Sequence, residues 1–266
     1  MAKRLLGIIF TSLIALGYAS TPNYSEFIEK YSAHLGPVGS YKTGEIEIVT
    51  DAEKIAAIQA QVKERLIKQG HSPENASNWS QVGIVAEDNY WVWVRDAVIF
   101  PSGNEGTYDR IMWRSTLDGP QGVAILPVCK DGRIGIVVKY RHATRSWEIE
   151  APSGTPLEKE ASIDTAIRKC CEETGFELAT VEKIGELAPF AGMATSIIAV
   201  YKGSIVISKL NNPGQTKAIH KIILLKREEL LEGFEKGYIN ISIHGRTTKA
   251  ACRDSALAYA LLRTST

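Results

Sequence analysis

The segment from Gly154 to Phe176 constrains this chain more than any other part of the sequence. It reads GTPLEKEASIDTAIRKCCEETGF, a glycine bend followed by an acidic residue, a short helical pattern and a closing glycine. Ser162 is expected to cap the helix at its start, and Gly175 suits the left-handed position that ends it. Apolar or small residues recur at helical spacing and predict one buried face: Ile163, Ala166, Ile167, Cys170 and Thr174.

The opposite face of this helix carries the charged residues. At about 100° per residue, Lys169, Glu172 and Glu173 share one side. Paired carboxylates at such a position can bind Mg²⁺ or Mn²⁺, which prefer oxygen ligands and bridge well to phosphate. The pattern therefore favours a divalent-metal site for phosphate chemistry.

The same segment resembles the Nudix box, G-x5-E-x7-R-E-U-x-E-E-x-G-U, in which U is a bulky apolar residue. Cys170 stands at the first apolar position. The other positions that match at the required intervals are Gly154, Glu160, Arg168, Glu172, Glu173, Gly175 and Phe176. The resemblance extends over roughly Gln81 to Leu262 and is greatest to the ADP-ribose pyrophosphatase branch of the family.

The resemblance implies a fold and a reaction. The fold is an α/β (α+β) sandwich with a mixed sheet between helices and a small N-terminal β region. The reaction is metal-dependent hydrolysis of a nucleoside diphosphate linked to another moiety, such as ADP-ribose. Glu172 and Glu173 are then catalytic metal ligands for Mg²⁺ or Mn²⁺, completed by a backbone carbonyl near Ser153 or Gly154.

Further roles follow from the same resemblance. Glu160 and Arg168 are expected to form an ion pair that fixes the loop on the helix, with Gly154 and Gly175 as structural positions of the motif. Arg141, in the run Lys139-Tyr140-Arg141, is expected to bind the substrate's diphosphate, because a planar guanidinium matches phosphate oxygens. A surface salt bridge is the alternative role for Arg141.

Two features depart from the family pattern. Lys169 stands where the family has a glutamate that binds metal, and an ammonium has no lone pair to donate. The loop at 211–217 lacks the acids that the branch usually has there. Glu148 or Glu150 can replace the missing carboxylate or serve a structural role. The alternative function is a catalytically impaired Nudix-fold protein that binds a nucleotide or a protein partner.

The N-terminus has the composition of an export signal. Lys3 and Arg4 precede an apolar run to Ala19, with Gly17 and Ala19 at the spacing of a signal-peptidase site. We therefore expect a secreted or periplasmic protein, or a membrane-anchored one if the segment stays uncleaved. The four cysteines are expected to be reduced and buried rather than to form disulfides.

The rest of the chain suggests its organisation and partners. We expect a signal peptide over 1–19, an N-terminal arm and helix over 20–80, a β region over 81–117 and a Nudix domain over 118–266. The arm, at 20–50, is expected to have little core of its own. Within these parts, 71–79 reads as a polar loop and 248–263 as a terminal helix. A net charge of +1 with no basic block argues against nucleic acid as a partner. The resemblance to the ADP-ribose pyrophosphatase branch implies a small-molecule nucleotide as partner and a homodimer joined through the N-terminal sheet.

Overall fold

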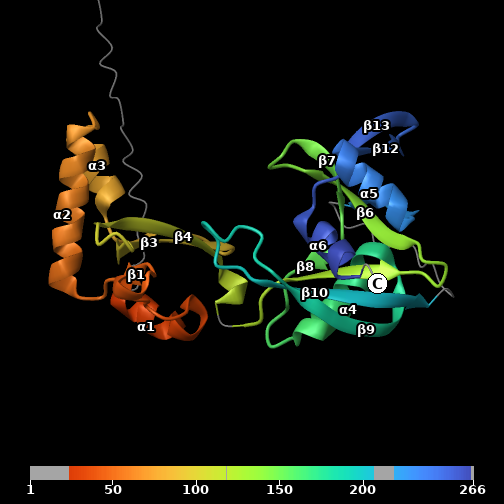
Figure 1. Cartoon of the computed structure of the whole chain (residues 1–266), viewed down its shortest axis with the longest axis horizontal. Coiled ribbons are helices and arrows are strands. Elements are labelled where there is room, and N and C mark those ends of the chain that lie inside the picture. Colours follow the sequence, from red (N-terminus) through yellow and green to blue (C-terminus); the bar gives the residue numbers. More distant parts are fainter. Residues whose placement is uncertain (1–23, 118, 207–218, 265–266) are drawn as a thin grey trace, which may run out of the picture.

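The computed structural model describes residues 24–117, 119–206 and 219–264, and shows two lobes side by side (Figure 1). The first lobe is a four-stranded sheet with three helices. Its elements are α1 (Tyr24–Leu35), β1 (Glu47–Ile48), α2 (Ala52–Lys68), α3 (Pro73–Ser80), β2 (Gly83–Glu87), β3 (Trp91–Ile99) and β4 (Glu105–Trp113). Strand β3 is its centre, because β4 pairs along one edge and β1 and β2 pair along the other.

The second lobe is a nine-stranded mixed sheet between helices. Its elements are β5 (Val123–Val128), β6 (Ile134–Arg141), β7 (Ser146–Glu150), β8 (Ser153–Gly154), α4 (Ser162–Thr174), β9 (Glu177–Leu187), β10 (Ile198–Val206), β11 (Ile219–Leu225), α5 (Arg227–Lys236), β12 (Tyr238–Ile243), β13 (Arg246–Ala251) and α6 (Ser255–Arg263). The sheet runs β12-β13-β7-β6-β5-β10-β9, with β11 beside β6 and β8 beside β5.

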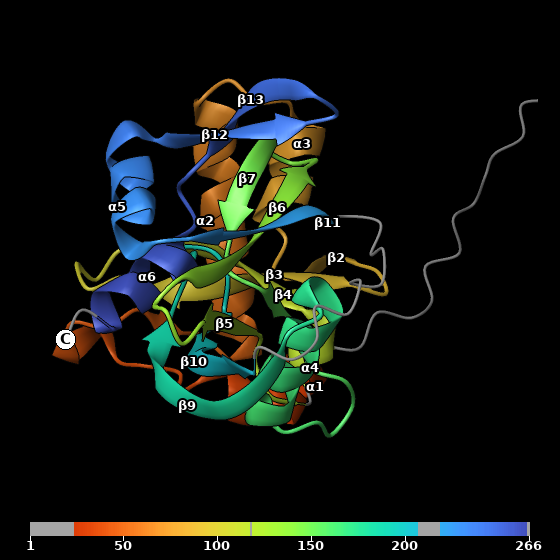
Figure 2. The same ribbon diagram turned by 90° about the vertical axis from the view of Figure 1, so that its right-hand side faces the viewer.

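Strict alternation along β5 shows how this sheet is covered on both faces. Val123 and Ile125 point into the core beneath α4, where they meet Ala166 and Cys170. Leu126 points to the other face, where the core includes residues of α5 and α6. Figure 2 shows α4 and α6 on opposite sides of the strands. The predicted α/β sandwich is therefore confirmed.

The same alternation decides which charged residues face α4. In β6, Ile136 and Val138 belong to the core on the α5 and α6 side, so Lys139 points toward α4. In β7, Ile149 belongs to that same core, so its neighbours Glu148 and Glu150 point toward α4 as well. The sheet thus gathers one lysine and two glutamates under the helix that carries the Nudix-box acids.

Three predictions made from the sequence are wrong at the level of elements. The arm is not without a core, because Phe27 and Tyr31 of α1 are buried against β3 and β4. Residues 71–79 are not a loop: Ser72 caps α3, and proline is well tolerated at the first position of a helix. Residues 248–263 are not one helix, because the first part pairs with β12 and Asp254 caps only α6.

The cysteines are free and only partly buried. Cys170 and Cys252 are buried, Cys129 is half-buried and Cys171 is exposed, so the burial prediction is wrong for Cys171. Among the described residues, none of the helices has the length and apolarity needed to cross a bilayer. The segment read as a signal peptide lies outside the described residues.

Candidate active site

Helix α4 is placed by its buried residues Ala166, Cys170 and Thr174 and ends at a glycine, whereas Ile163 and Ile167, also predicted to be buried, are exposed. Gly175 takes a left-handed conformation (φ 71°) and donates to the carbonyl of Cys171. The cap at the other end is Ala161 rather than Ser162, which is the first helical residue, so that detail of the prediction is wrong. The charged face of α4 meets strand β8, where the predicted bend at Gly154 pairs with β5.

Gly154 leaves room for the side chain of Lys169. A Cβ at position 154 would lie 2.5 Å from Cε and 2.6 Å from Cδ of Lys169. Contacts under about 3.0 Å do not occur between such atoms, so any larger residue would displace the lysine. The glycine of the motif therefore accommodates the very residue that departs from the motif.

Glu160 and Arg168 form the ion pair expected between loop and helix. Arg168 donates from Nε to Oε1 at 2.7 Å and from Nη2 to Oε2 at 2.6 Å, and it also reaches the carbonyl of Thr155 at 3.2 Å. Glu160 accepts further bonds from the Leu157 amide and the Thr165 hydroxyl, both at 2.9 Å. The hydrogen bonds from Arg168, followed by those from the Leu157 amide and the Thr165 hydroxyl, lower the pKa of Glu160 to about 2. Glu160 is therefore fully engaged in holding the loop.

Glu172 is held by two cations on its own helix. Lys169 Nζ lies 2.9 Å from Oε2, and Arg168 Nη1 lies 3.0 Å from Oε1. Burial acts to raise the pKa of Glu172, but the bonds from Lys169 and Arg168 outweigh it and lower the pKa. The side chain is 42% exposed, so it remains the most accessible of the motif's acids.

Glu173 is held by a residue that the sequence did not single out, Lys139 of β6. Its Nζ lies 2.9 Å from Oε1 and 3.1 Å from Oε2 of Glu173, and 3.7 Å from Oε2 of Glu150. The amide of Ser153 donates to Oε2 of Glu173 at 3.1 Å. Strand β6, helix α4 and strand β8 thus meet at one carboxylate. The signal available in the sequence was a lone lysine at the end of the apolar run IGIVV.

Arg141 is paired rather than free. It makes two bonds to Glu150, from Nε at 2.7 Å and from Nη2 at 2.5 Å. These bonds raise the pKa of the Arg141 guanidinium, so it keeps its charge at all relevant pH values. Glu148 is engaged with Arg253 (2.6 Å) and with two hydroxyls of the β6–β7 hairpin. The salt-bridge alternative for Arg141 is present, and neither Glu148 nor Glu150 stands as a spare carboxylate.

These contacts decide whether the donor set fits a divalent metal ion. The motif brings the right residue types to one place, but each acid is already bound by an ammonium or guanidinium. At about 4 Å and an effective dielectric near 20, a divalent ion and an ammonium repel by roughly 8 kcal/mol. In the part of the chain that the structure describes, no three His, Cys, Asp or Glu side chains converge to hold a metal. The residues present therefore do not fit the Mg²⁺ site that the motif predicts.

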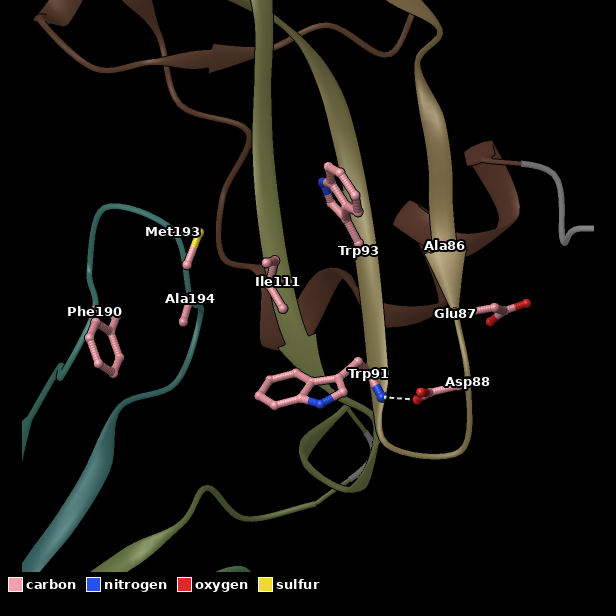
Figure 3. A pocket seen from close by; sticks show the side chains of 9 residues that line it. All are labelled: Ala86, Glu87, Asp88, Trp91, Trp93, Ile111, Phe190, Met193 and Ala194. Atoms are coloured by element: carbon pink, nitrogen blue, oxygen red, sulfur yellow. Dashed lines mark hydrogen bonds between the residues drawn. The ribbon is translucent and has the colours of Figure 1, made fainter. Parts of the chain in front are cut away.

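A separate apolar cavity of about 530 Å³ lies between the first lobe and the 190–194 turn (Figure 3). Trp91 and Trp93 of β3, Ile111 of β4 and the exposed side chains of Phe190 and Met193 line it. The turn is fixed to β4 by the Ile111 amide, which donates to the Met193 carbonyl at 2.9 Å. The tryptophans Trp91 and Trp93 of β3 therefore line a cavity. No Nudix-box residue is among its lining.

The acid-free loop at 211–217 lies outside the described residues.

Comparison with known proteins relates the second lobe to a family. The model of the NUDIX domain matches residues 119–241, which span β5 to β12 and contain the whole site. Residues 119–241 are therefore a NUDIX domain, which confirms the predicted resemblance to the Nudix family and to its ADP-ribose pyrophosphatase-like branch. Members of this family generally use a divalent metal ion such as Mg²⁺.

Two curated proteins are similar to part of the chain. The methanol dehydrogenase activator of Bacillus methanolicus is 30% identical over 101 residues, 38% of this chain and 55% of that protein. The ADP-ribose pyrophosphatase of Bacillus subtilis (strain 168) is 31% identical over 88 residues, 33% of this chain and 48% of that protein. The chain thus spans about half the length of each. The crystal structure of an ADP compounds hydrolase covers 58% of this chain and 80% of its own, at 17% identity and a TM-score of 0.47.

Proposed function

We propose that this chain hydrolyses a nucleoside diphosphate linked to another moiety, with an ADP-ribose-like compound as its substrate. Membership of the Nudix family supports this class of reaction in general. A relative that is 31% identical over the matched region is an ADP-ribose pyrophosphatase. The observation that carries the proposal is the position of Glu172 and Glu173, which end α4 directly beside the β8 bend, with Glu173 bonded to the Ser153 amide.

In this reaction water adds across the phosphoanhydride: its oxygen bonds to one phosphorus, and the bond from that phosphorus to the bridging oxygen breaks. ADP-ribose would give AMP and ribose 5-phosphate. Arg141 is 46% exposed and lies at the edge of the site, so its guanidinium is the residue we assign to the diphosphate. To bind a phosphate oxygen, Arg141 would give up one of its two hydrogen bonds to Glu150. Glu150 would then still have the Lys139 ammonium nearby.

The test is a pyrophosphatase assay on the purified full chain. ADP-ribose is incubated with Mg²⁺, with Mn²⁺ or with EDTA, and AMP is measured by chromatography. We expect slow turnover that is lost in Glu172→Gln/Glu173→Gln, which also controls for a contaminating enzyme. We expect Lys169→Glu to be faster than the wild type, because it restores the carboxylate that the motif has at this position. Equal AMP formation by the wild type and the double glutamine variant would show that the chain is not the hydrolase.

A second candidate function is supported by the pairing of every motif acid with a cation. In this alternative the chain is a catalytically impaired Nudix-fold protein that binds a nucleotide or a protein partner. Calorimetric titration of ADP-ribose separates the two candidates. Binding without turnover favours the impaired protein, turnover favours the hydrolase, and the absence of both leaves a protein partner as the ligand class to be sought by crosslinking.

Location, organisation and assembly are also proposals. We propose export through the N-terminal segment, division of the mature chain near residue 118 and a homodimer formed through the first lobe. N-terminal sequencing of protein from the culture medium or periplasm would show cleavage after Ala19. Light scattering of the full chain and of a 119–266 fragment would show whether the dimer depends on the first lobe.

A further inference from the structure

A buried ammonium lies at the centre of the candidate active site. Lys139 is 3% exposed, and its Nζ contacts both oxygens of Glu173 and approaches Glu150. It projects from the middle of the sheet, beside the buried residues Val137 and Val138. The side chain is therefore almost fully buried, and moving its ammonium away from Glu173 would leave a buried charge without its partner.

Lys169 differs from Lys139 in this respect. Its side chain is 24% exposed and lies over Gly154, so the ammonium can leave Glu172 and swing into water. Replacement of Lys169 alone would therefore remove a mobile cation and leave the fixed one in place. The fixed cation is the one that bonds the second glutamate of the motif.

We infer that the Lys139 ammonium is a built-in substitute for a divalent cation, so that this Nudix site is assembled without a metal ion. The ammonium does structurally what a bound cation would do: it joins carboxylates from α4 and β7 next to the backbone of β8. This inference concerns how the site is held together, and it stands whether or not a nucleoside diphosphate is the substrate.

The charge balance of the site supports the inference. The carboxylates and cations form two groups of ion pairs, each with a net charge of zero: Glu150 and Glu173 with Lys139 and Arg141, and Glu160 and Glu172 with Arg168 and Lys169. A site for Mg²⁺ needs an excess of negative charge to offset the dehydration of the ion. A net charge of zero, with an ammonium bonded to the would-be ligand, provides no such excess.

The experiment is a Mn²⁺ titration of the full chain, followed by the electron paramagnetic resonance signal of the free ion. We expect that Glu173 binds no Mn²⁺ in the wild type. The Glu173→Gln variant should therefore give the same titration curve as the wild type. The Lys139→Gln/Lys169→Glu variant should bind one Mn²⁺ ion at least about tenfold more tightly than the wild type does. The reason is that this variant loses two cations and gains a carboxylate. Lys183→Gln/Lys202→Glu is the matched control, since it makes the same charge change at two exposed pairs on β9 and β10. It should bind Mn²⁺ as weakly as the wild type.

Two results would overturn the inference. One is a wild-type Mn²⁺ site that Glu173→Gln abolishes. The other is a folded Lys139→Gln/Lys169→Glu protein, by circular dichroism, that binds no better than the control. If that double variant does not fold, thermal unfolding of the wild type tests the inference instead. The melting temperature should be the same in EDTA and in Mg²⁺ at equal ionic strength, because only an ion that binds the native state raises the melting temperature. An increase with Mg²⁺ that Glu173→Gln removes would contradict the inference.

Discussion

Removing the buried ammonium is the most direct perturbation of this protein's stability. Lys139→Met keeps most of the volume but leaves Glu173, whose side chain is 13% exposed, with only the Ser153 amide as partner. Breaking a buried pair in this way costs about 3–5 kcal/mol. The lower end applies, because Glu173 keeps one hydrogen bond and some contact with water. We therefore expect a loss of about 3 kcal/mol in the free energy of unfolding, or about 6–12 °C in melting temperature for a domain of this size.

A second substitution distinguishes a lost charge pair from lost packing. In Lys139→Met/Glu173→Gln the amide is neutral and can still accept the bond from Ser153, so we expect stability to return to within about 1 kcal/mol of the wild type. The assay is urea unfolding followed by tryptophan fluorescence for the wild type, both single variants and the double variant. The reasoning is refuted if Lys139→Met changes stability by less than about 0.5 kcal/mol, or if the two single effects simply add.

Three further predictions concern other contacts. Glu160 has its pKa lowered to about 2, so its bonds to Arg168 stabilise the protein above the unfolded-state pKa and lose effect as pH falls from about 5 toward 2; the stability gap between the wild type and Glu160→Gln should shrink over that range in urea titrations. Asp254 caps α6 and also accepts from the Ala151 amide at 3.0 Å, so Asp254→Ala should cost about 2 kcal/mol by thermal unfolding, and Asp254→Asn clearly less. Trp93 Nε1 is buried with no hydrogen-bond partner among the described residues, so Trp93→Phe should leave stability unchanged or raise it by about 1 kcal/mol, and a large loss would reveal a partner.

Two lysines of the site show which contacts can be predicted from the sequence and which cannot. Lys169 falls inside a motif with fixed spacing, so its position on the helix follows from the sequence. Its bond to Glu172 follows from positions i and i+3 on one helix. Lys139 lies 34 residues before Glu173, and nothing local joins them. Only the pairing of β6 with β7 and the packing of α4 over that face bring the ammonium to the carboxylate.

The sequence by itself determined the local elements and the family. The glycine stop at 175 and the helical spacing that buries Ala166 and Cys170 depend on neighbouring residues, and both are present. Tertiary structure decided what those elements enclose. The aromatic residues of α1 are buried against strands β3 and β4, which lie far from them in the sequence. The acids of the metal-binding motif are paired with lysines and carry no excess negative charge. The reason is physical: backbone conformation is set within a few residues, whereas the charge around a buried carboxylate is the sum over every strand and helix packed against it.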